Sequence, residues 1–383
     1  MKILLLGVAI TMLAGIGQAV ASSNYGNQFQ SGNSNEANIS QVSESTNNTA
    51  YQWQEGDNNQ SYVGQSFSDN SYVDQSQIGT RNWAETKQVN QEDSEAFTYQ
   101  EGEGNMGILH QWGGSRNTAN AYQAGRENTI YLDQYVSSND NLADMEQGGN
   151  DNMSSLVQEG DGNYFRSFQV FDSNVFYGGQ VGNGNIGDLF QLGLENTAYL
   201  VQTGDFNFME VIQRASNNSM VTVTQDGKGH YSRVWQGGHD NVVIGTQNGV
   251  NNFSFIQTFG FDNTTKLVQS GSVNMADFYQ WGETNLATID QTGNSNSVSG
   301  ASEGVANTID IDQVGELNLA EVGQYELGSS DNIIVLSQNG VEHSAYLGQI
   351  GSENTTFVTQ TSANNMASVF QLGDSNVATT SQN

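Results

Sequence analysis

The chain has 383 residues, with 44 glycines, no proline and no cysteine, and only 36% of its residues are hydrophobic. The lack of cysteine excludes disulfide bonds and thiolate metal sites. The 41 acidic and 10 basic residues give a formal net charge of −31. This charge disfavours nucleic acid and anionic membrane surfaces as partners, because their phosphates would repel the chain.

The first residues predict a secretory signal peptide. Lys2 is followed by a mostly apolar stretch from Ile3 to Ile16, and Ala19-Val20-Ala21 is a small-x-small cleavage site. The apolar stretch is shorter than the roughly 20 residues that span a bilayer. We therefore expect residues 1–21 to be removed and residues 22–383 to be secreted to the cell surface through the periplasm. We do not expect an integral membrane protein.

The rest of the chain repeats one short unit, N-x-A-x-Φ-x-Q-x-G, in which Φ is apolar. Copies are NTAYLVQTG at 196–204, NLATIDQTG at 285–293 and NTIDIDQVG at 307–315. The repeated Gln can be assigned 32 times between Gln30 and Gln382, most often at intervals of eleven residues. In this assignment Gln75 and Gln257 count as repeated Gln residues, and Ser302 is the only replacement.

The residue six positions before the repeated Gln is Asn in most units; the exceptions are Asp69, Ser94, Ser219, His230 and His343. Between these Asn and Gln positions, small or apolar residues alternate with mixed and often polar ones, which indicates a strand and not an eleven-residue helical repeat. We expect a seven-residue strand from Asn to Gln, followed by a turn of four residues that contains Gly. Insertions fall between Gln and the next Asn, as expected of a turn.

Two such strands and turns make one rung of about 22 residues. The sequence thus predicts an all-β fold, a parallel in-register β-solenoid of about sixteen two-strand rungs that fills residues 22–383 as one repeat domain. Stacked Asn and Gln side chains would form hydrogen-bonded ladders, and Ala and aliphatic residues would fill a thin core between them.

The units that match the repeat best supply the candidate structural residues. The predicted ladder residues are Asn196, Gln202, Asn274, Gln280, Asn285, Gln291, Asn307, Gln313, Asn354, Gln360, Asn365 and Gln371. The predicted turn glycines are Gly193, Gly204, Gly282, Gly293 and Gly315.

These units resemble the curlin repeat of bacterial curli fibres, the extracellular amyloid of biofilms. The family pattern Q-x-G-x-x-N-x-A-x-x-x-Q occurs as QLGLENTAYLVQ at 191–202 and as QWGETNLATIDQ at 280–291. The resemblance implies a structural subunit of an extracellular amyloid-like fibre that functions in the biofilm matrix and in cell adhesion. Its partners would be further copies of itself, a related curlin subunit and an outer-membrane export machinery.

Nothing in the sequence predicts catalysis, a metal site or a cofactor. The four histidines are His110, His230, His239 and His343, and His230 and His343 occupy the Asn position of the repeat, as ladder variants would. Ser, Asp and Glu show no nucleophile–base pattern. We therefore expect no enzyme, and in particular no polysaccharide-cleaving β-helix.

Two alternatives stay open. The chain could be a monomeric cell-surface adhesin or binding module, with the five tryptophans as a carbohydrate-binding face, although their scatter favours ordinary strand positions. Asp290 and Asp312 are 22 residues apart and should stack. They would either belong to a solvated acidic face or bind Ca²⁺ or Mg²⁺ between them.

Overall fold

The computed structural model describes residues 23–42, 44–325 and 328–383. The predicted signal peptide lies outside the described residues. The chain divides into a first compact unit that ends at Ser167 and a second that begins at Phe168. The described residues contain strands and no helix. Whether residues 22–383 form a single domain stays a prediction.

The first unit contains β1 (Tyr25–Ser31), β2 (Glu36–Val42), β3 (Thr49–Asp57), β4 (Gln60–Ser66), β5 (Tyr72–Thr80), β6 (Trp83–Glu92), β7 (Glu95–Glu103), β8 (Met106–Ser115), β9 (Thr118–Arg126), β10 (Thr129–Asn139), β11 (Leu142–Asn150) and β12 (Met153–Glu159). The boundary between the units falls within β13 (Tyr164–Val170).

The second unit continues with β14 (Val175–Val181), β15 (Ile186–Leu194), β16 (Thr197–Asp205), β17 (Phe208–Asn217), β18 (Met220–Lys228), β19 (Tyr231–His239), β20 (Val242–Val250), β21 (Phe253–Phe261), β22 (Thr264–Ser272) and β23 (Met275–Glu283). It ends with β24 (Leu286–Asn294), β25 (Ser297–Val305), β26 (Thr308–Glu316), β27 (Leu319–Tyr325), β28 (Ile333–Val341), β29 (Ser344–Ile350), β30 (Thr355–Ala363), β31 (Met366–Leu372) and β32 (Val377–Gln382).

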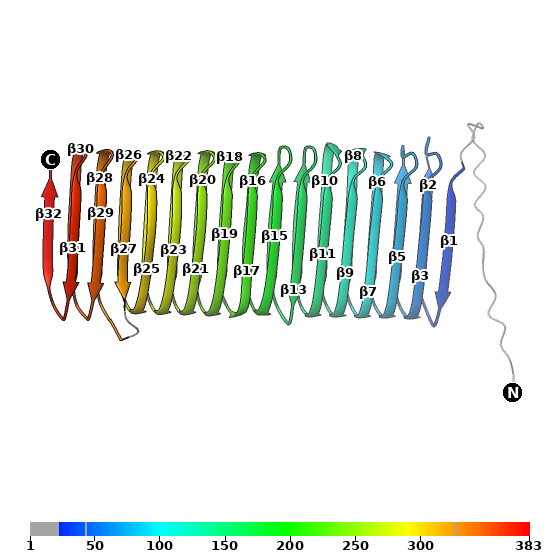
Figure 1. Ribbon diagram of the computed structural model, residues 1–383. Helices are drawn as coiled ribbons and strands as arrows, with labels where there is room; N and C mark the ends of the chain where they lie inside the picture. The colour runs from blue at the N-terminus through cyan, green and yellow to red at the C-terminus, as the bar shows by residue number, and fades with distance from the viewer. Residues whose placement is uncertain (1–22, 43, 326–327) are drawn as a thin grey trace. The chain divides into compact units, whose positions relative to one another are not determined.

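Within each unit the odd-numbered strands form one sheet and the even-numbered strands form another, as Figure 1 shows. We call these the odd sheet and the even sheet. Strands inside a sheet pair in parallel with the strands two before and two after them, for example β24 with β22 and β26. With two strands to a rung, the 32 strands correspond to about sixteen rungs. The predicted parallel β-solenoid is confirmed.

The register places equivalent residues of the repeat opposite one another. Gln291 pairs with Gln269 on one side and with Gln313 on the other. Such pairing puts identical amides at the spacing of neighbouring strands, about 4.8 Å, so each amide can bond to the next one along the axis.

Two positions of the predicted register are wrong. Gln77, and not Gln75, lies opposite Gln54 and Gln100. In β21 the equivalent residue is Thr258, which lies opposite Gln236 and Gln280, whereas Gln257 points to the outer face. The Asn position of this unit, directly before β5, is correspondingly occupied by Ser71 and not by Asp69.

The glycine two residues later marks the true register. Gly79 and Gly260 lie two residues after Gln77 and Thr258, as the glycine does in other units. Each lies so close to the glycine backbone of the next rung that a residue with a side chain could not take its place, which fixes the register of the strand. Counting from the nearest Gln alone therefore misplaces these two strands.

The predicted division into strand and turn also needs correction. Strands begin one residue after Asn, and most run on through the glycine: β24 starts at Leu286 and contains Gly293. The sharpest bend is at the residue before Asn, which has a positive φ in almost every unit, such as 57° at Thr284 and 55° at Ser295. These bends are made by many residue types, so the sequence carries no distinct signal for them.

The core is thin, and each strand contributes two side chains to it. In β24 these are Ala287 and Ile289, both essentially inaccessible to solvent. Large and small residues compensate between rungs: Phe278 is fully buried against Gly300, where an added Cβ would lie 2.8 Å from the Phe278 ring. Burying one aliphatic side chain stabilises by about 1.5–3 kcal/mol, so each rung depends on its neighbours.

Candidate functional site: the amide ladders and the edge strands

The Gln ladder of the even sheet is a continuous chain of side-chain amides in the second unit. Gln269 Nε2 donates to Gln291 Oε1 at 2.8 Å, and Gln291 donates to Gln313 at 2.9 Å. The second hydrogen of Gln291 Nε2 goes across the core to the backbone oxygen of Met275 at 2.9 Å. The ladder thus links successive rungs and also links the two sheets.

The Asn ladder holds the corners of the rungs. Asn263 Oδ1 accepts from the backbone nitrogen and from Nδ2 of Asn285, both at 3.0 Å. Asn285 Nδ2 also donates to the backbone oxygen of Gly304 at 2.9 Å. Asn fits this position because a single short side chain reaches the backbone of both the next Asn and the next glycine corner.

The structure buries eleven of the twelve predicted ladder residues, and Asn365 is half-buried. Gln202, Gln291, Gln313 and Gln360 donate to the next Gln of the even sheet, and Gln371 accepts from Gln349. Asn196, Asn274, Asn285, Asn307 and Asn354 donate through their backbone nitrogens to the preceding Asn.

Gln280 lies outside this pattern. Its neighbours in the odd sheet are Thr258 and Ser302, whose side chains are too short to continue the ladder. Gln280 is fully buried, its Oε1 accepts from Thr265 Oγ1 at 2.9 Å, and its Nε2 has no hydrogen-bond partner. The odd sheet therefore has an interrupted Gln ladder in the same rungs in which the even sheet has a continuous one.

Four of the five predicted turn glycines have a φ that other residues rarely adopt: 99° at Gly204, 128° at Gly282, 115° at Gly293 and 119° at Gly315. A Cβ on Gly293 would lie 2.0 Å from the backbone oxygen of Gly315, so the position also lacks space. Gly193 has no such φ and lies where the pairing of β15 with β17 shifts register. Its φ thus differs from that of the other four, and its role as a turn glycine stays a prediction.

The two histidines at Asn positions accept the hydrogen bond that Asn would accept. Nδ1 of His230 accepts from the backbone nitrogen of Asn252 at 3.3 Å, and Nδ1 of His343 accepts from Asn365 in the same way. Burial lowers the pKa of His230, which keeps its ring neutral at physiological pH. Both residues lie within the ladders, as the sequence predicted.

The edge strands of the described residues carry opposite hydrogen-bonding groups. β31 and β32 pair only with β29 and β30, and β1 and β2 pair only with β3 and β4. In the Gln ladders the Gln that comes earlier in the chain is the donor. Gln30 Nε2 donates to Gln54 Oε1 at one edge, and Gln360 Nε2 donates to Gln382 Oε1 at the other.

In the Asn ladders the Asn that comes earlier in the chain is the acceptor. Asn24 Oδ1 accepts from the backbone nitrogen of Asn48 at one edge, and Asn354 Oδ1 accepts from that of Asn376 at the other. A rung added beyond β32 would therefore meet Gln donors and Asn acceptors. A rung added before β1 would meet Gln acceptors and Asn donors.

Asp290 and Asp312 do stack, since they are paired residues of β24 and β26. Burial raises the pKa of Asp312, and the charges of Asp290 and Asp310 add to the shift. No cluster of three or more metal-ligating side chains is present in the described part of the chain. Both interpretations of the stacked pair, a solvated acidic face and a divalent-cation site, stay hypotheses.

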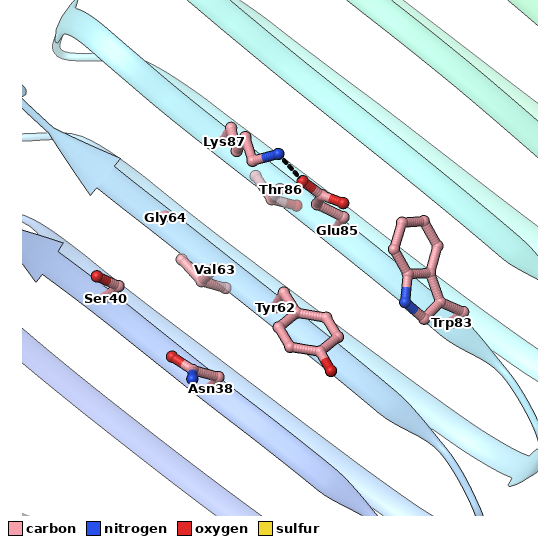
Figure 2. A pocket seen from close by; sticks show the side chains of 9 residues that line it. All are labelled: Asn38, Ser40, Tyr62, Val63, Gly64, Trp83, Glu85, Thr86 and Lys87. Carbon is pink, nitrogen blue, oxygen red and sulfur yellow. Dashed lines mark ion pairs between the residues drawn. The ribbon is translucent and has the colours of Figure 1, made fainter.

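The tryptophans do not share one face. Trp83 begins β6 in the even sheet, where it borders a hollow of about 490 Å³ over Gly64 (Figure 2). Tyr62 of β4 and Trp83 of β6 have ring centroids 6.5 Å apart, and the Glu85–Lys87 ion pair lies further along β6. The complete lining is Asn38, Ser40, Tyr62, Val63, Gly64, Trp83, Glu85, Thr86 and Lys87.

Comparison with protein families finds the curlin associated repeat at residues 274–299 and 330–361. Comparison with curated proteins gives no significant match. The described residues include no helix of the length and apolarity needed to cross a membrane. The matched segments lie in the second unit and include six of the predicted ladder residues, namely Asn274, Gln280, Asn285, Gln291, Asn354 and Gln360. The chain therefore carries curlin repeats, which confirms its resemblance to the curlin-repeat family.

Proposed function

We propose that the chain is a structural, non-catalytic subunit of an extracellular curli-type amyloid fibre in the biofilm matrix, where it also serves cell adhesion. It would reach the cell surface through the periplasm and an outer-membrane export machinery. The fibre would grow by edge-to-edge strand addition between copies, or onto a related curlin subunit. The curlin repeats and the β-solenoid support this proposal.

The observation that carries the proposal is the complementarity of the edge strands. If β31 and β32 of one copy meet β1 and β2 of the next, Gln371 and Gln382 face Gln30 and Gln41 with donors opposite acceptors. The exposed ring of Phe370 would meet that of Phe29, which already stacks on Trp53 with centroids 4.1 Å apart. Unpaired strand edges of this kind template further pairing.

Purified residues 22–383 should form thioflavin-positive fibres after a lag, and preformed fibres should shorten that lag. Fibre diffraction should show spacings of about 4.8 Å and about 10 Å. A protein that stays monomeric for weeks at high concentration, even with seeds, would contradict the proposal.

The alternative function is a monomeric binding module on the cell surface. The hollow over Gly64 favours it, because aromatic rings and polar groups meet there in a concave site. Binding of soluble oligosaccharides by the monomer, lost on Trp83→Ala and accompanied by no fibre growth, would support this alternative.

A further inference from the structure

The outer face of the odd sheet is rich in aromatic rings in the second unit, across β17, β19, β21 and β23. The outward side chains of these four strands form what we call the aromatic face. Phe208, Tyr231 and Phe253 form a column of stacked rings, with centroids 4.8 and 4.9 Å apart and interplanar angles of 12° and 6°. Further along the strands the face is filled by Trp235, Phe255, Phe259, Tyr279 and Trp281.

Much of this face is accessible to solvent. The exposed fraction is 38% for Phe253, 53% for Phe261 and 51% for Trp281. The even sheet at the same rungs has mainly threonine and aliphatic residues in its outward positions, such as Thr222, Ile244 and Thr246. Contiguous exposed apolar patches of several hundred Å² usually mark interaction sites.

The segment from β17 to β21, which carries three of the four strands of the face, has no net charge, and β23 adds Asp277 and Glu283. Residues 208–261 contain three basic residues (Arg214, Lys228, Arg233) and three acidic ones (Glu210, Asp226, Asp240), so their formal charge is zero in a chain at −31. Arg233 and Glu210 form an ion pair between the aromatic rings. Repulsion between two copies is therefore smallest where their aromatic faces meet.

The stacked column of Phe208, Tyr231 and Phe253 favours a protein partner over a glycan. In the stacked column each ring covers the face of the next, so ring edges point outward. A sugar ring binds an aromatic side chain through an open ring face, whereas a second sheet interdigitates with side-chain edges, as in steric zippers.

We propose that the aromatic face binds the same face of a second copy and joins neighbouring fibres laterally. The inference rests on the proposed function. Strands of seven residues over four rungs cover roughly 450 Å², about half of the ~800 Å² per partner in a standard interface. One pair of faces is therefore weak, but a fibre repeats the contact in every copy, and this multivalency stabilises the lateral pair.

The test compares Phe253→Asp with Val242→Asp, which changes the same position of the repeat on the even sheet. Fibre growth is followed by thioflavin fluorescence, and bundling by electron microscopy and low-speed sedimentation of the same samples. We expect Phe253→Asp fibres to grow but to stay single, and Val242→Asp fibres to bundle like the unmodified protein. Bundles of Phe253→Asp fibres, or equal loss of bundling in both variants, would overturn the inference.

A thiol experiment covers the case in which an aspartate impairs folding. The chain has no cysteine, so Phe253→Cys and Val242→Cys each introduce a single thiol. In bundled fibres a bismaleimide should produce covalent dimers of Phe253→Cys and few of Val242→Cys. An end-to-end stack separates equivalent thiols by a whole molecule, so dimers report lateral contact. Equal dimer yields would overturn the inference, while absence of fibres in the unmodified protein would instead contradict the proposed function.

Discussion

At the scale of single residues, the ladders are effective because each amide uses all of its hydrogen-bonding groups. Gln291 accepts from one Gln and donates to another and to a backbone oxygen across the core. Buried polar groups are tolerated when they are satisfied in this way. Gln280 has no amide neighbour in its sheet, and its Nε2 is buried without a hydrogen-bond partner.

Replacing Gln291 with Leu should therefore destabilise the protein. It leaves the buried Gln313 Oε1 without its donor, at about 1–3 kcal/mol, and it removes one of the two hydrogen bonds that Gln269 Nε2 donates, the other going to the backbone oxygen of Phe253. Thr288→Ala, at an outward position of the same strand, should change stability by less than about 0.5 kcal/mol. Chemical denaturation measures both, and equal losses would show that the ladder contributes no more than the surface.

His230 should make stability depend on pH. Burial lowers its pKa in the folded protein, so the unfolded chain binds a proton first as pH falls. Its contribution is complete above the ordinary histidine pKa of about 6.5 and is lost as pH decreases through that value. His230→Asn should reduce the decrease in Tm between pH 7.5 and pH 5.5, and an unchanged decrease would contradict this assignment.

At the scale of elements, most strands end in a corner that combines a glycine with a left-handed residue just before Asn. Gly293 and Ser295 are such a pair, with φ of 115° and 55°. The glycine backbone packs directly on the glycine of the next rung, and Asn Nδ2 binds its oxygen. The corner is thus part of the axial stack.

Gly293→Ala should lower stability by at least about 1–3 kcal/mol, since both its φ and the adjacent oxygen exclude a side chain. Gly245→Ala is the matched control, because Gly245 has no positive φ and an added Cβ would make ordinary contact with Val223 at 3.9 Å. Its stability should stay the same or rise by up to about 1 kcal/mol. Thermal unfolding distinguishes the two, and similar Tm values would refute the special role of the corner.

The edge strand β32 offers a direct test of growth by strand addition. The backbone nitrogen of Thr355, one rung earlier, donates to Asn376, and the same parallel pattern turns the backbone N–H of Thr379 toward the open edge. Thr379→Pro removes that donor and should slow seeded growth strongly, whereas Thr379→Val keeps the donor and should grow normally. Equal growth of both variants would exclude β32 as a growing edge.

At the scale of the molecule, charge opposes assembly. A chain at −31 stacks many like charges at the spacing of its rungs, as Asp290 and Asp312 show. Such repulsion keeps the protein soluble and is weakened by salt. Under the proposal above, contact between copies is expected where acidic residues are few, as in residues 208–261, whose three acidic and three basic residues cancel.

Salt should therefore shorten the lag before fibre growth, and it should do so through ionic strength. If Asp290 and Asp312 belong to a solvated acidic face, calcium acts only by screening their charges, and millimolar Ca²⁺ should act like Na⁺ at equal ionic strength. A shorter lag in calcium, abolished when Asp290 and Asp312 are both changed to Asn, would instead establish a bridging site.

The sequence by itself determined the β-solenoid, its two strands per rung and the inward Asn and Gln positions, because a period of two within a period of eleven admits few other folds. The tertiary structure alone decided the register at Gln77 and Thr258, the positive φ before each Asn, and the interruption beside Gln280. These depend on which residues of neighbouring rungs meet, and a residue such as Gln75 matches the repeat equally well until its neighbours are known. For the same reason the aromatic face became visible only when strands 22 or 23 residues apart were placed side by side.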